Sequence, residues 1–282
     1  MRVAIFVNPI KPGVFDYTRD VISRLNGLGA EVFTSKKYER ALSGAGATFR
    51  SGVNEVIFPC DVVLTIGGDG TIIHFAKHAA KLSKPILGIN FGRLGFVAGL
   101  ERNDLDKLEQ LVHGNYRVQK RGLLEVTAHK NGQEKRFVAF NDAVISKGER
   151  TKIIDFSVFL ANNEVCSYRA DGTILATATG STAYSLSAGG PIVDPTLECV
   201  LLTPVCPHAM FAKPIVFSSA HPITIKAEAG EDRGIFLNID GNNVMNLSGC
   251  EAVEVACAKE KVDMITFDDR SFGKRLVEKF LK

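Results

Sequence analysis

Over the first ~115 residues, short apolar runs alternate with segments whose apolar side chains recur every three or four positions. Unbroken apolar runs are typical of strands buried on both faces of a parallel sheet, and the second spacing places apolar side chains on one face of a helix. We expect strands at residues 3–7, 31–34, 61–66 and 85–89, and helices at residues 15–28, 70–82 and 104–113, the last capped by Asn103. This alternation predicts an α/β domain over residues 1–117, with a Rossmann-like parallel sheet covered by helices.

The pattern changes to short alternating runs after about residue 117. Residues 124–129 and 136–145 flank an Asn-Gly pair at residues 131–132, which is a strong sequence signal for a hairpin turn. A second hairpin is expected from residues 153–160 and 164–168, and further strands at residues 174–177, 223–227, 235–239 and 252–258. This half predicts a β-rich, sandwich-like domain over residues 118–262. Residues 267–282 carry apolar side chains at helical spacing, and we expect the C-terminal segment 263–282 to pack on the first domain through this helix.

Composition argues against several classes of partner. The 282 residues include 34 basic and 31 acidic side chains, and a net charge of +3 is too balanced to indicate a nucleic-acid or anionic-membrane partner. No apolar stretch approaches the ~18 residues that a membrane span needs. The six cysteines form no C-x-x-C pair, and the histidines do not have zinc-ligand spacing. We therefore expect reduced thiols, a cytoplasmic location and no metal site built from protein side chains alone.

The sequence GGDGT at residues 67–71 joins an expected strand to an expected helix. Glycines allow the backbone to approach a ligand closely, and the free N–H groups at a helix start attract phosphate. Asp69 would repel a phosphate unless it had another task, such as binding a ribose hydroxyl, accepting its proton, or meeting a metal carried by the phosphates. The structural alternative is that Asp69 only caps the helix that follows.

Two further stretches combine polar side chains with small residues. Residues 177–191 are dense in glycine and small hydroxylated residues. This favours a polar pocket at a helix start, with Tyr184 offering a flat face, over a surface loop. Asn141 and Asp142 offer the hydrogen-bond donors and acceptors that a nucleoside needs, although an Asn-Asp pair is also common in turns. The pair Asp240-Gly241 is, by itself, only a good turn.

Taken in order along the chain, these stretches resemble the motifs of the NAD kinase family. The matching segments are GGDGT at residues 67–71, G-x-L-G-F at 92–96, Asn141-Asp142, residues 171–184, LTPVCPH at 202–208 and Asp240-Gly241. GGDGT alone is shared with phosphofructokinases and lipid kinases, but the whole series is specific. The resemblance implies a two-domain enzyme with NAD between its domains. Such an enzyme transfers the terminal phosphate of ATP, or of another donor, to the 2′-hydroxyl of the adenosine ribose of NAD and makes NADP.

The resemblance also implies which residues form the site. Asp69 matches the proton acceptor, Asn141 and Asp142 the pair that binds the substrate nucleotide, and Asp171 another substrate contact. Nucleotide contacts are further implied for Gly68, Gly70, Thr71, Phe96, Thr179, Thr182, Ala183, Tyr184, Ser185, Leu186 and Ser187, and secondary ones for His74, Lys152, Arg169 and Asn242. A divalent ion, Mg²⁺, would arrive with the donor's phosphates. The partners implied are small-molecule nucleotides and further copies of the chain, in a homodimer or homotetramer.

The chain departs from the family's pattern at three positions. Asp142 stands where Glu is frequent, Ala178 where Pro is frequent, and Asn242 where Gln is frequent. None of these changes removes a charge or a hydroxyl from the reaction centre. Two alternatives stay open: a lipid or sugar kinase would share GGDGT but leave the other stretches without a role, and a non-catalytic NAD(P) sensor would not need Asp69.

Overall fold

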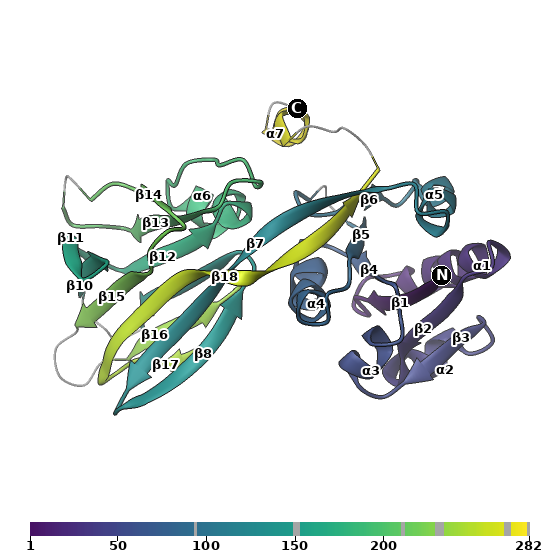
Figure 1. Cartoon of the computed structure of the whole chain (residues 1–282), viewed down its shortest axis with the longest axis horizontal. Helices are drawn as coiled ribbons and strands as arrows, with labels where there is room; N and C mark the ends of the chain where they lie inside the picture. Colours follow the sequence, from purple (N-terminus) through teal and green to yellow (C-terminus); the bar gives the residue numbers. More distant parts are fainter. Residues whose placement is uncertain (93–94, 149–152, 210–211, 229–233, 268–271, 281–282) are drawn as a thin grey trace. The chain divides into compact units, whose positions relative to one another are not determined.

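The structure is a computed structural model that describes residues 1–92, 95–148, 153–209, 212–228, 234–267 and 272–280. The chain forms two compact units: unit 1 comprises Met1–Arg121 and Val262–Lys282, and unit 2 comprises Gly122–Lys261. In Figure 1 the purple and blue elements belong to unit 1, and the green ones belong to unit 2. The boundaries between the units fall inside two long strands, β7 (Arg117–Lys130) and β18 (Cys250–Thr266).

Unit 1 is built on a parallel sheet. Its strand order is β18-β5-β4-β1-β2-β3, and β6 pairs with β5. The strands that lie wholly in this unit are β1 (Arg2–Val7), β2 (Glu31–Ser35), β3 (Ala47–Arg50), β4 (Val62–Gly67), β5 (Ile86–Asn90) and β6 (Leu100–Glu101). Every residue of β4 and of β5 is buried. The expected parallel sheet is therefore confirmed.

Helices α1 (Val14–Gly27) and α4 (Asp69–Lys81) are the two long helices among the described residues of unit 1. The shorter ones are α2 (Glu39–Leu42), α3 (Val53–Ile57), α5 (Leu108–Val112) and α7 (Phe272–Phe280). Val21, Ile22 and Leu25 of α1 are fully buried against the sheet side chains of β1 and β4. The sequence pattern missed α2, β3 and α3. Asn103 is not a cap: Asp104 precedes the 3₁₀ turn Leu105–Lys107, and its carboxylate accepts a hydrogen bond from the N–H of Glu101 at 2.9 Å.

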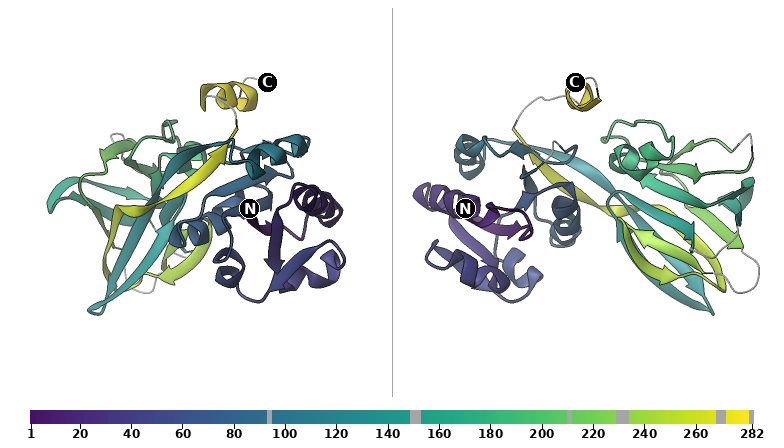
Figure 2. Two further views of the ribbon diagram at one scale, coloured as in Figure 1. Left: turned by 45° about the vertical axis from the view of Figure 1, so that its right-hand side comes forward. Right: turned by 180° about the vertical axis from the view of Figure 1, so that it is seen from behind.

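Unit 2 contains two antiparallel sheets. One has the order β14-β13-β12-β9-β16-β17; in the other, β11-β10-β15-β18 form a continuous run, and β7 pairs with β18 and β8. The strands not yet defined are β8 (Gln133–Ala139), β9 (Asp142–Lys147), β10 (Ile154–Leu160), β11 (Asn163–Ala170), β12 (Gly172–Thr177), β13 (Cys199–Val205), β14 (Ile215–Ser218), β15 (Ile223–Glu228), β16 (Ile235–Ile239) and β17 (Asn242–Asn246). Figure 2 shows the hairpin of β7 and β8 from two further directions.

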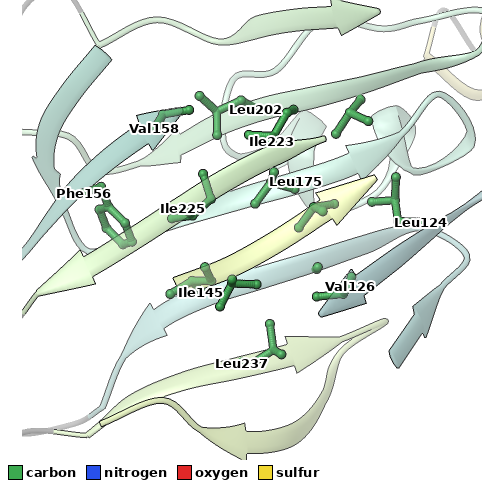
Figure 3. Close-up of a cluster of buried hydrophobic side chains, with 14 of the residues drawn as sticks. Leu124, Val126, Ile145, Phe156, Val158, Leu175, Leu202, Ile223, Ile225 and Leu237 are labelled. Atoms are coloured by element: carbon green, nitrogen blue, oxygen red, sulfur yellow. The ribbon is translucent and has the colours of Figure 1, made fainter. Parts of the chain in front are cut away.

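The core of unit 2 comes from alternate residues of both sheets. Figure 3 shows this cluster, in which β10 and β15 contribute Phe156, Val158, Ile223 and Ile225. The facing sheet contributes Ile145, Leu175, Leu202 and Leu237. Two antiparallel sheets whose alternate side chains meet in one core are the arrangement of a β-sandwich. The expected β-rich second domain is therefore confirmed.

The expected single strand over residues 136–145 is wrong, because the chain changes sheet inside it. β8 ends at Ala139 and pairs with β7, whereas β9 begins at Asp142 and pairs with β12 and β16. Between them, the N–H groups of Phe140 and Asn141 donate to the carboxylate of Asp240 rather than to a strand. Backbone groups that find side-chain acceptors leave the ladder, so the strand ends there.

The expected Asn-Gly turn joins β7 and β8, with positive φ at both Asn131 (52°) and Gly132 (69°). The turn between β16 and β17 is similar, with positive φ at Asp240 (48°) and Gly241 (78°). Positive φ at both central residues is the mark of a type I′ turn. All six cysteines are free thiols. Across the part of the chain that the structure describes, no helix is both long and apolar enough to cross a bilayer.

Candidate active site

The glycine-rich turn connects β4 to α4 in unit 1. Gly67 is the last residue of β4, and a Cβ added there would lie 2.4 Å from Oγ1 of Thr71. Gly68 precedes the helix, and its carbonyl accepts hydrogen bonds from the N–H groups of Thr71 and Ile72. The turn therefore needs glycine at Gly67 because no side chain fits. The first N–H groups of α4 have no partner within the helix, which makes this end attractive to anions.

Asp69 is the first residue of α4, and the N-cap position before it is occupied by Gly68. The alternative in which Asp69 is the cap of this helix is therefore wrong. Its Oδ2 instead accepts a hydrogen bond from the N–H of Phe96 at 3.0 Å, and Oδ1 accepts one from Val97 at 3.4 Å. A Cβ on Gly95 would lie 2.0 Å from Oδ1 of Asp69. The carboxylate is thus held by the backbone of residues 95–97, which only glycine at position 95 allows.

A pocket of about 400 Å³ lies beside this turn, and we call it the unit 1 pocket. Its lining includes Asn8, Lys11, Lys37, Gly68, Gly70, Thr71 and His74. Burial, and then Lys77 and Lys37, lower the pKa of His74 below its usual value. The imidazole is therefore neutral at neutral pH, and the positive charge of the pocket comes from its two lysines.

A second pocket of about 360 Å³ lies in unit 2, and we call it the unit 2 pocket. Its lining includes Asn141, Asp142, Ala183, Tyr184, Asn238 and Asp240. Asp142 is only 5% exposed, whereas Tyr184 is 47% exposed and offers its ring to a ligand. Burial, followed by the negative charge of Asp240, raises the pKa of Asp142 to about 7. No lysine or arginine is among the described residues of this lining.

The end of β12 and the residues that follow it pack against the backbone of Phe140 and Asn141, beside the unit 2 pocket. Oγ1 of Thr177 donates to the carbonyl of Phe140 at 2.8 Å and accepts from the N–H of Gly180 at 2.9 Å. The N–H of Thr177 donates to the carbonyl of Asn141 at 2.8 Å. A Cβ on Gly180 would lie only 2.0 Å from that same carbonyl oxygen. The small residues of this segment therefore allow close packing against the backbone of Asn141.

Several residues that the resemblance assigned do not line either pocket. Ser185 is buried and its hydroxyl lies 2.8 Å from that of Thr203, so it stabilises the short helix α6 (Tyr184–Ser187) from inside. Thr182 donates to the carbonyl of Thr179 at 3.2 Å. The buried hydroxyl of Thr179 has no hydrogen-bond partner among the described residues. Leu186 and Ser187 lie on α6 outside both linings.

The charged residues assigned by the resemblance are engaged elsewhere in unit 2. Arg169 forms an ion pair with Asp155 of the neighbouring strand at 3.1 Å. Asp171 pairs with Lys147 at 2.6 Å. Asn242 is exposed at the start of β17, and Lys152 lies outside the described residues. In unit 1, the ammonium group of Lys279 lies 3.9 Å from the centre of the Phe96 ring.

Both pockets also contain residues that sequence reasoning did not assign. Asn8, Lys11 and Lys37 line the unit 1 pocket, and Ser146 and Asn238 line the unit 2 pocket. The sequence did contain a signal for Asn8. This residue directly follows the first apolar run, just as Gly67 lies at the end of another apolar run. Because β1 and β4 are adjacent parallel strands, with Val7 beside Ile66, their carboxyl ends meet. No comparable signal existed for Lys37, which reaches the pocket from the turn after β2.

The described residues contain no group of three or more His, Cys, Asp or Glu side chains placed to hold a metal ion. The carboxylates beside the two pockets are engaged by backbone N–H groups, as at Asp69, or face another carboxylate, as at Asp142.

Comparisons with known proteins identify the family of the chain. The family model described as ATP-NAD kinase N-terminal domain matches residues 3–116, and the one described as ATP-NAD kinase C-terminal domain matches residues 140–267. The NAD kinase of Syntrophotalea carbinolica is 35% identical over 273 residues, with 96% of this chain and 95% of the relative covered. The NAD kinase of Symbiobacterium thermophilum is 38% identical over 268 residues, covering 91% and 90%.

Two solved structures have the same fold. An NAD kinase from Archaeoglobus fulgidus in complex with ATP superposes with a TM-score of 0.76 at 26% identity, covering 99% of this chain and 98% of that one. A yeast NADH kinase complexed with NADH superposes with a TM-score of 0.87 at 24% identity, covering 100% and 87%. At that identity the second likeness concerns the fold alone.

Proposed function

The chain belongs to the NAD kinase family and phosphorylates NAD to NADP with ATP as a substrate, and from this premise we propose which pocket serves each substrate. In the proposal, the unit 2 pocket binds the adenosine part of NAD and the unit 1 pocket binds the phosphates of the donor. The observation that carries it is the difference in charge between the two linings: lysines line the unit 1 pocket, and carboxylates line the unit 2 pocket.

The unit 2 pocket suits an uncharged nucleoside. The amide of Asn141 can both donate and accept hydrogen bonds, as a base edge requires, and the carboxyl group of Asp142 suits a ribose hydroxyl. Tyr184 provides a half-exposed aromatic face on which a base can stack. A lining with two acidic groups and no described cation disfavours a phosphate, which supports assigning the donor's phosphates to the unit 1 pocket.

The unit 1 pocket suits the donor's phosphates. Lys11 and Lys37 supply positive charge, and the N-terminal end of the 13-residue helix α4 supplies N–H groups and a favourable dipole. Phosphoryl transfer depends on positioning and on stabilising the charge of the transferred group. Lysines and backbone N–H groups can do both.

Asp69 has the role of accepting the proton of the 2′-hydroxyl. The hydrogen bonds from Phe96 and Val97 fix the direction of its carboxylate. A carboxylate oxygen has more than one lone pair, so Oδ1 and Oδ2 can each accept a further hydrogen bond. General-base assistance of this kind typically contributes about 10²–10⁴-fold to a rate.

On the resemblance, we propose that Mg²⁺ arrives with the donor and is held by its phosphates. When bound in this way it would neutralise phosphate charge. None of the residue roles above depends on it.

The assignment of one pocket to each substrate is tested by steady-state kinetics. The assay contains purified protein, NAD, ATP and Mg²⁺, and it measures the NADP formed. Lys37→Met should raise KM for ATP roughly 10-fold and change KM for NAD less than about twofold, because a charge-assisted contact is lost on one substrate only. Asn141→Ala should do the reverse. Lys81→Met, on the exposed last turn of α4, is the matched control and should change neither. If Lys37→Met and Asn141→Ala raise the same KM, the assignment of the pockets is overturned.

The same assay addresses the two alternatives. A lipid or sugar kinase would phosphorylate those acceptors rather than NAD, and a sensor would bind NAD without making NADP. On the resemblance alone we also propose a cytoplasmic homodimer or homotetramer. Its mass in solution, measured by light scattering, tests the oligomeric state.

A further inference from the structure

Asp240 occupies the tip of the β16–β17 hairpin, in a two-residue turn with Gly241. Its φ of 48° is a left-handed conformation, which Asp and Asn tolerate better than most other side chains. The hairpin pairs with β9, so the turn lies beside the segment where β8 gives way to β9. The position of Asp240 is thus set by sheet register, which places it beside Asn141 and Asp142.

The carboxylate of Asp240 accepts hydrogen bonds from three consecutive backbone N–H groups. Its oxygens lie 3.0 Å from the N of Phe140, 2.7 Å from that of Asn141 and 3.3 Å from that of Asp142. Three N–H groups that converge on one carboxylate fix the course of the backbone through these residues. The N–H of Asp240 in turn donates to the carbonyl of Asp142 at 3.0 Å.

The backbone of Asn141 is held from the other side as well. Its carbonyl accepts the hydrogen bond from Thr177 at 2.8 Å, and Gly180 packs against the same oxygen. Its N–H and its carbonyl are therefore both fixed, by segments that lie far from it in the sequence. The direction in which the Asn141 and Asp142 side chains leave the backbone therefore depends on the hydrogen bonds to Asp240 and on the contacts with Thr177 and Gly180.

We propose that Asp240 is a positioning residue for nucleotide recognition: its carboxylate, by binding three consecutive N–H groups, orients Asn141 and Asp142 toward the substrate. This inference rests on the proposed function of the unit 2 pocket. In this proposal Asp240 does more than form the turn, because its carboxylate also fixes the backbone of the residues that bind the nucleotide. Asp240 acts through its neighbours, so its loss alters how well NAD is bound more than the rate of the chemical step.

The competing explanation is that Asp240 is present only because Asp-Gly forms a good type I′ turn. Asn-Gly forms the same turn equally well, so Asp240→Asn keeps the turn. It removes the negative charge that the three N–H groups share, however, and places an NH₂ group where Oδ2 accepts from the N–H of Phe140. The Asn131-Gly132 turn of the β7–β8 hairpin has the same conformation and lines neither pocket, so Asn131→Ala measures what loss of a turn residue costs by itself.

The experiment compares Asp240→Asn, Asp240→Ala and Asn131→Ala by thermal unfolding and by kinetics of NADP formation. Asp240→Asn should unfold close to the wild-type temperature and raise KM for NAD roughly 10-fold, with kcat and KM for ATP changed less than about threefold. Asp240→Ala should raise KM for NAD at least as much. Asn131→Ala should lower thermal stability and leave KM for NAD unchanged.

The pH dependence of NAD binding provides a readout that a purely structural role would not change. Among the described groups, Asp240 is the charged residue that acts on Asp142, so its removal should lower the pKa of Asp142. The pH at which KM for NAD changes should therefore move to lower pH in Asp240→Asn.

Two results would overturn the inference, and they differ in what else they overturn. If Asn141→Ala raises KM for NAD but Asp240→Asn leaves both KM and its pH profile unchanged, Asp240 is only a turn residue. If Asn141→Ala itself leaves KM for NAD unchanged, the proposed function of the pocket fails and the positioning role fails with it.

Discussion

The two pockets differ in how they surround a carboxyl group. In unit 1, Asp69 lies at the start of a helix, two backbone N–H groups bind its oxygens, and lysines line the neighbouring pocket. In unit 2, Asp142 is buried, its lining contains no described cation, and it lies near a second carboxylate, Asp240. One site provides donors and positive charge around an acid, and the other provides burial and negative charge.

Under the proposed assignment of the pockets, this difference explains how one chain distinguishes two nucleotides that share most of their chemistry. NAD and ATP both contain adenosine, so recognition of a base and a ribose cannot distinguish them. A lysine-lined pocket favours the more highly charged phosphate chain, and an acid-lined pocket favours the uncharged nucleoside. The three tests below follow this contrast in order of expected effect on NADP formation, from a loss of rate through a loss of affinity to a change of stability.

The largest effect is expected at Asp69, because its loss removes the proposed proton acceptor. Asp69→Asn should lower kcat by about 10²–10⁴-fold and change the affinity for NAD far less. Gly95→Ala is the matched variant, since its Cβ would displace the 95–97 backbone while the carboxylate remains. Turnover near the wild-type value in Asp69→Asn, or an equal loss in both variants, would leave Asp69 as a residue that only anchors residues 95–97.

A smaller effect is expected from Tyr184, which provides a flat face in the unit 2 pocket. Tyr184→Ala should weaken NAD binding roughly 10-fold, because stacking of a base on an aromatic ring contributes about 1–3 kcal/mol. Ile192→Ala is a control at an exposed apolar residue of the same unit that lines neither pocket. Isothermal titration calorimetry measures both, and an unchanged dissociation constant for Tyr184→Ala would place the ring outside the binding surface.

The smallest effect, and the one most specific to the contrast, concerns the pH dependence of stability. The pKa of Asp142 is about 7 in the folded chain and has its usual value of 3.8 when unfolded. Between these values the folded state binds more protons, so the free energy of unfolding falls as pH rises and levels off above about 7. From pH 5 to pH 8 this carboxyl should cost on the order of 2–3 kcal/mol.

Asp142→Asn removes that titration and keeps the shape of the side chain. Its melting temperature should therefore rise relative to that of the wild type as pH increases from 5 to 8. Parallel curves for the two proteins over this range would show that Asp142 does not titrate there, and that its surroundings resemble those of Asp69 more than the structure indicates.

The fold could be predicted where local pattern decides it. The buried runs of β1, β4 and β5 and the Asn131-Gly132 turn were readable because apolar periodicity and turn chemistry are local properties. The division of residues 136–145 between two sheets was not, because the group that ends the ladder is Asp240, about 100 residues further along the chain. A single strand pattern contains no sign of such an acceptor.

The candidate site shows the same limit. GGDGT and Asn141-Asp142 were recognisable as motifs, yet the N–H groups that hold Asp69 come from residues 95–97, and those lie beside it only once β5 pairs with β4. Lys37 carries no motif and reaches the unit 1 pocket through the position of β2. Conversely, Ser185 belongs to a motif but faces Thr203 in the interior, since a sequence does not say which side of a short helix is buried.

The three hydrogen bonds to Asp240 also have a consequence for the order of events during synthesis. They span 98 to 100 residues, so Phe140, Asn141 and Asp142 leave the ribosome long before their acceptor does. At roughly 5–20 residues per second, the interval is on the order of 5–20 s. During this time the backbone of the recognition pair has no lasting partner on that side. Under the proposed role of Asp240, the ability to recognise the nucleotide is therefore acquired late, when the β16–β17 hairpin is added to β9.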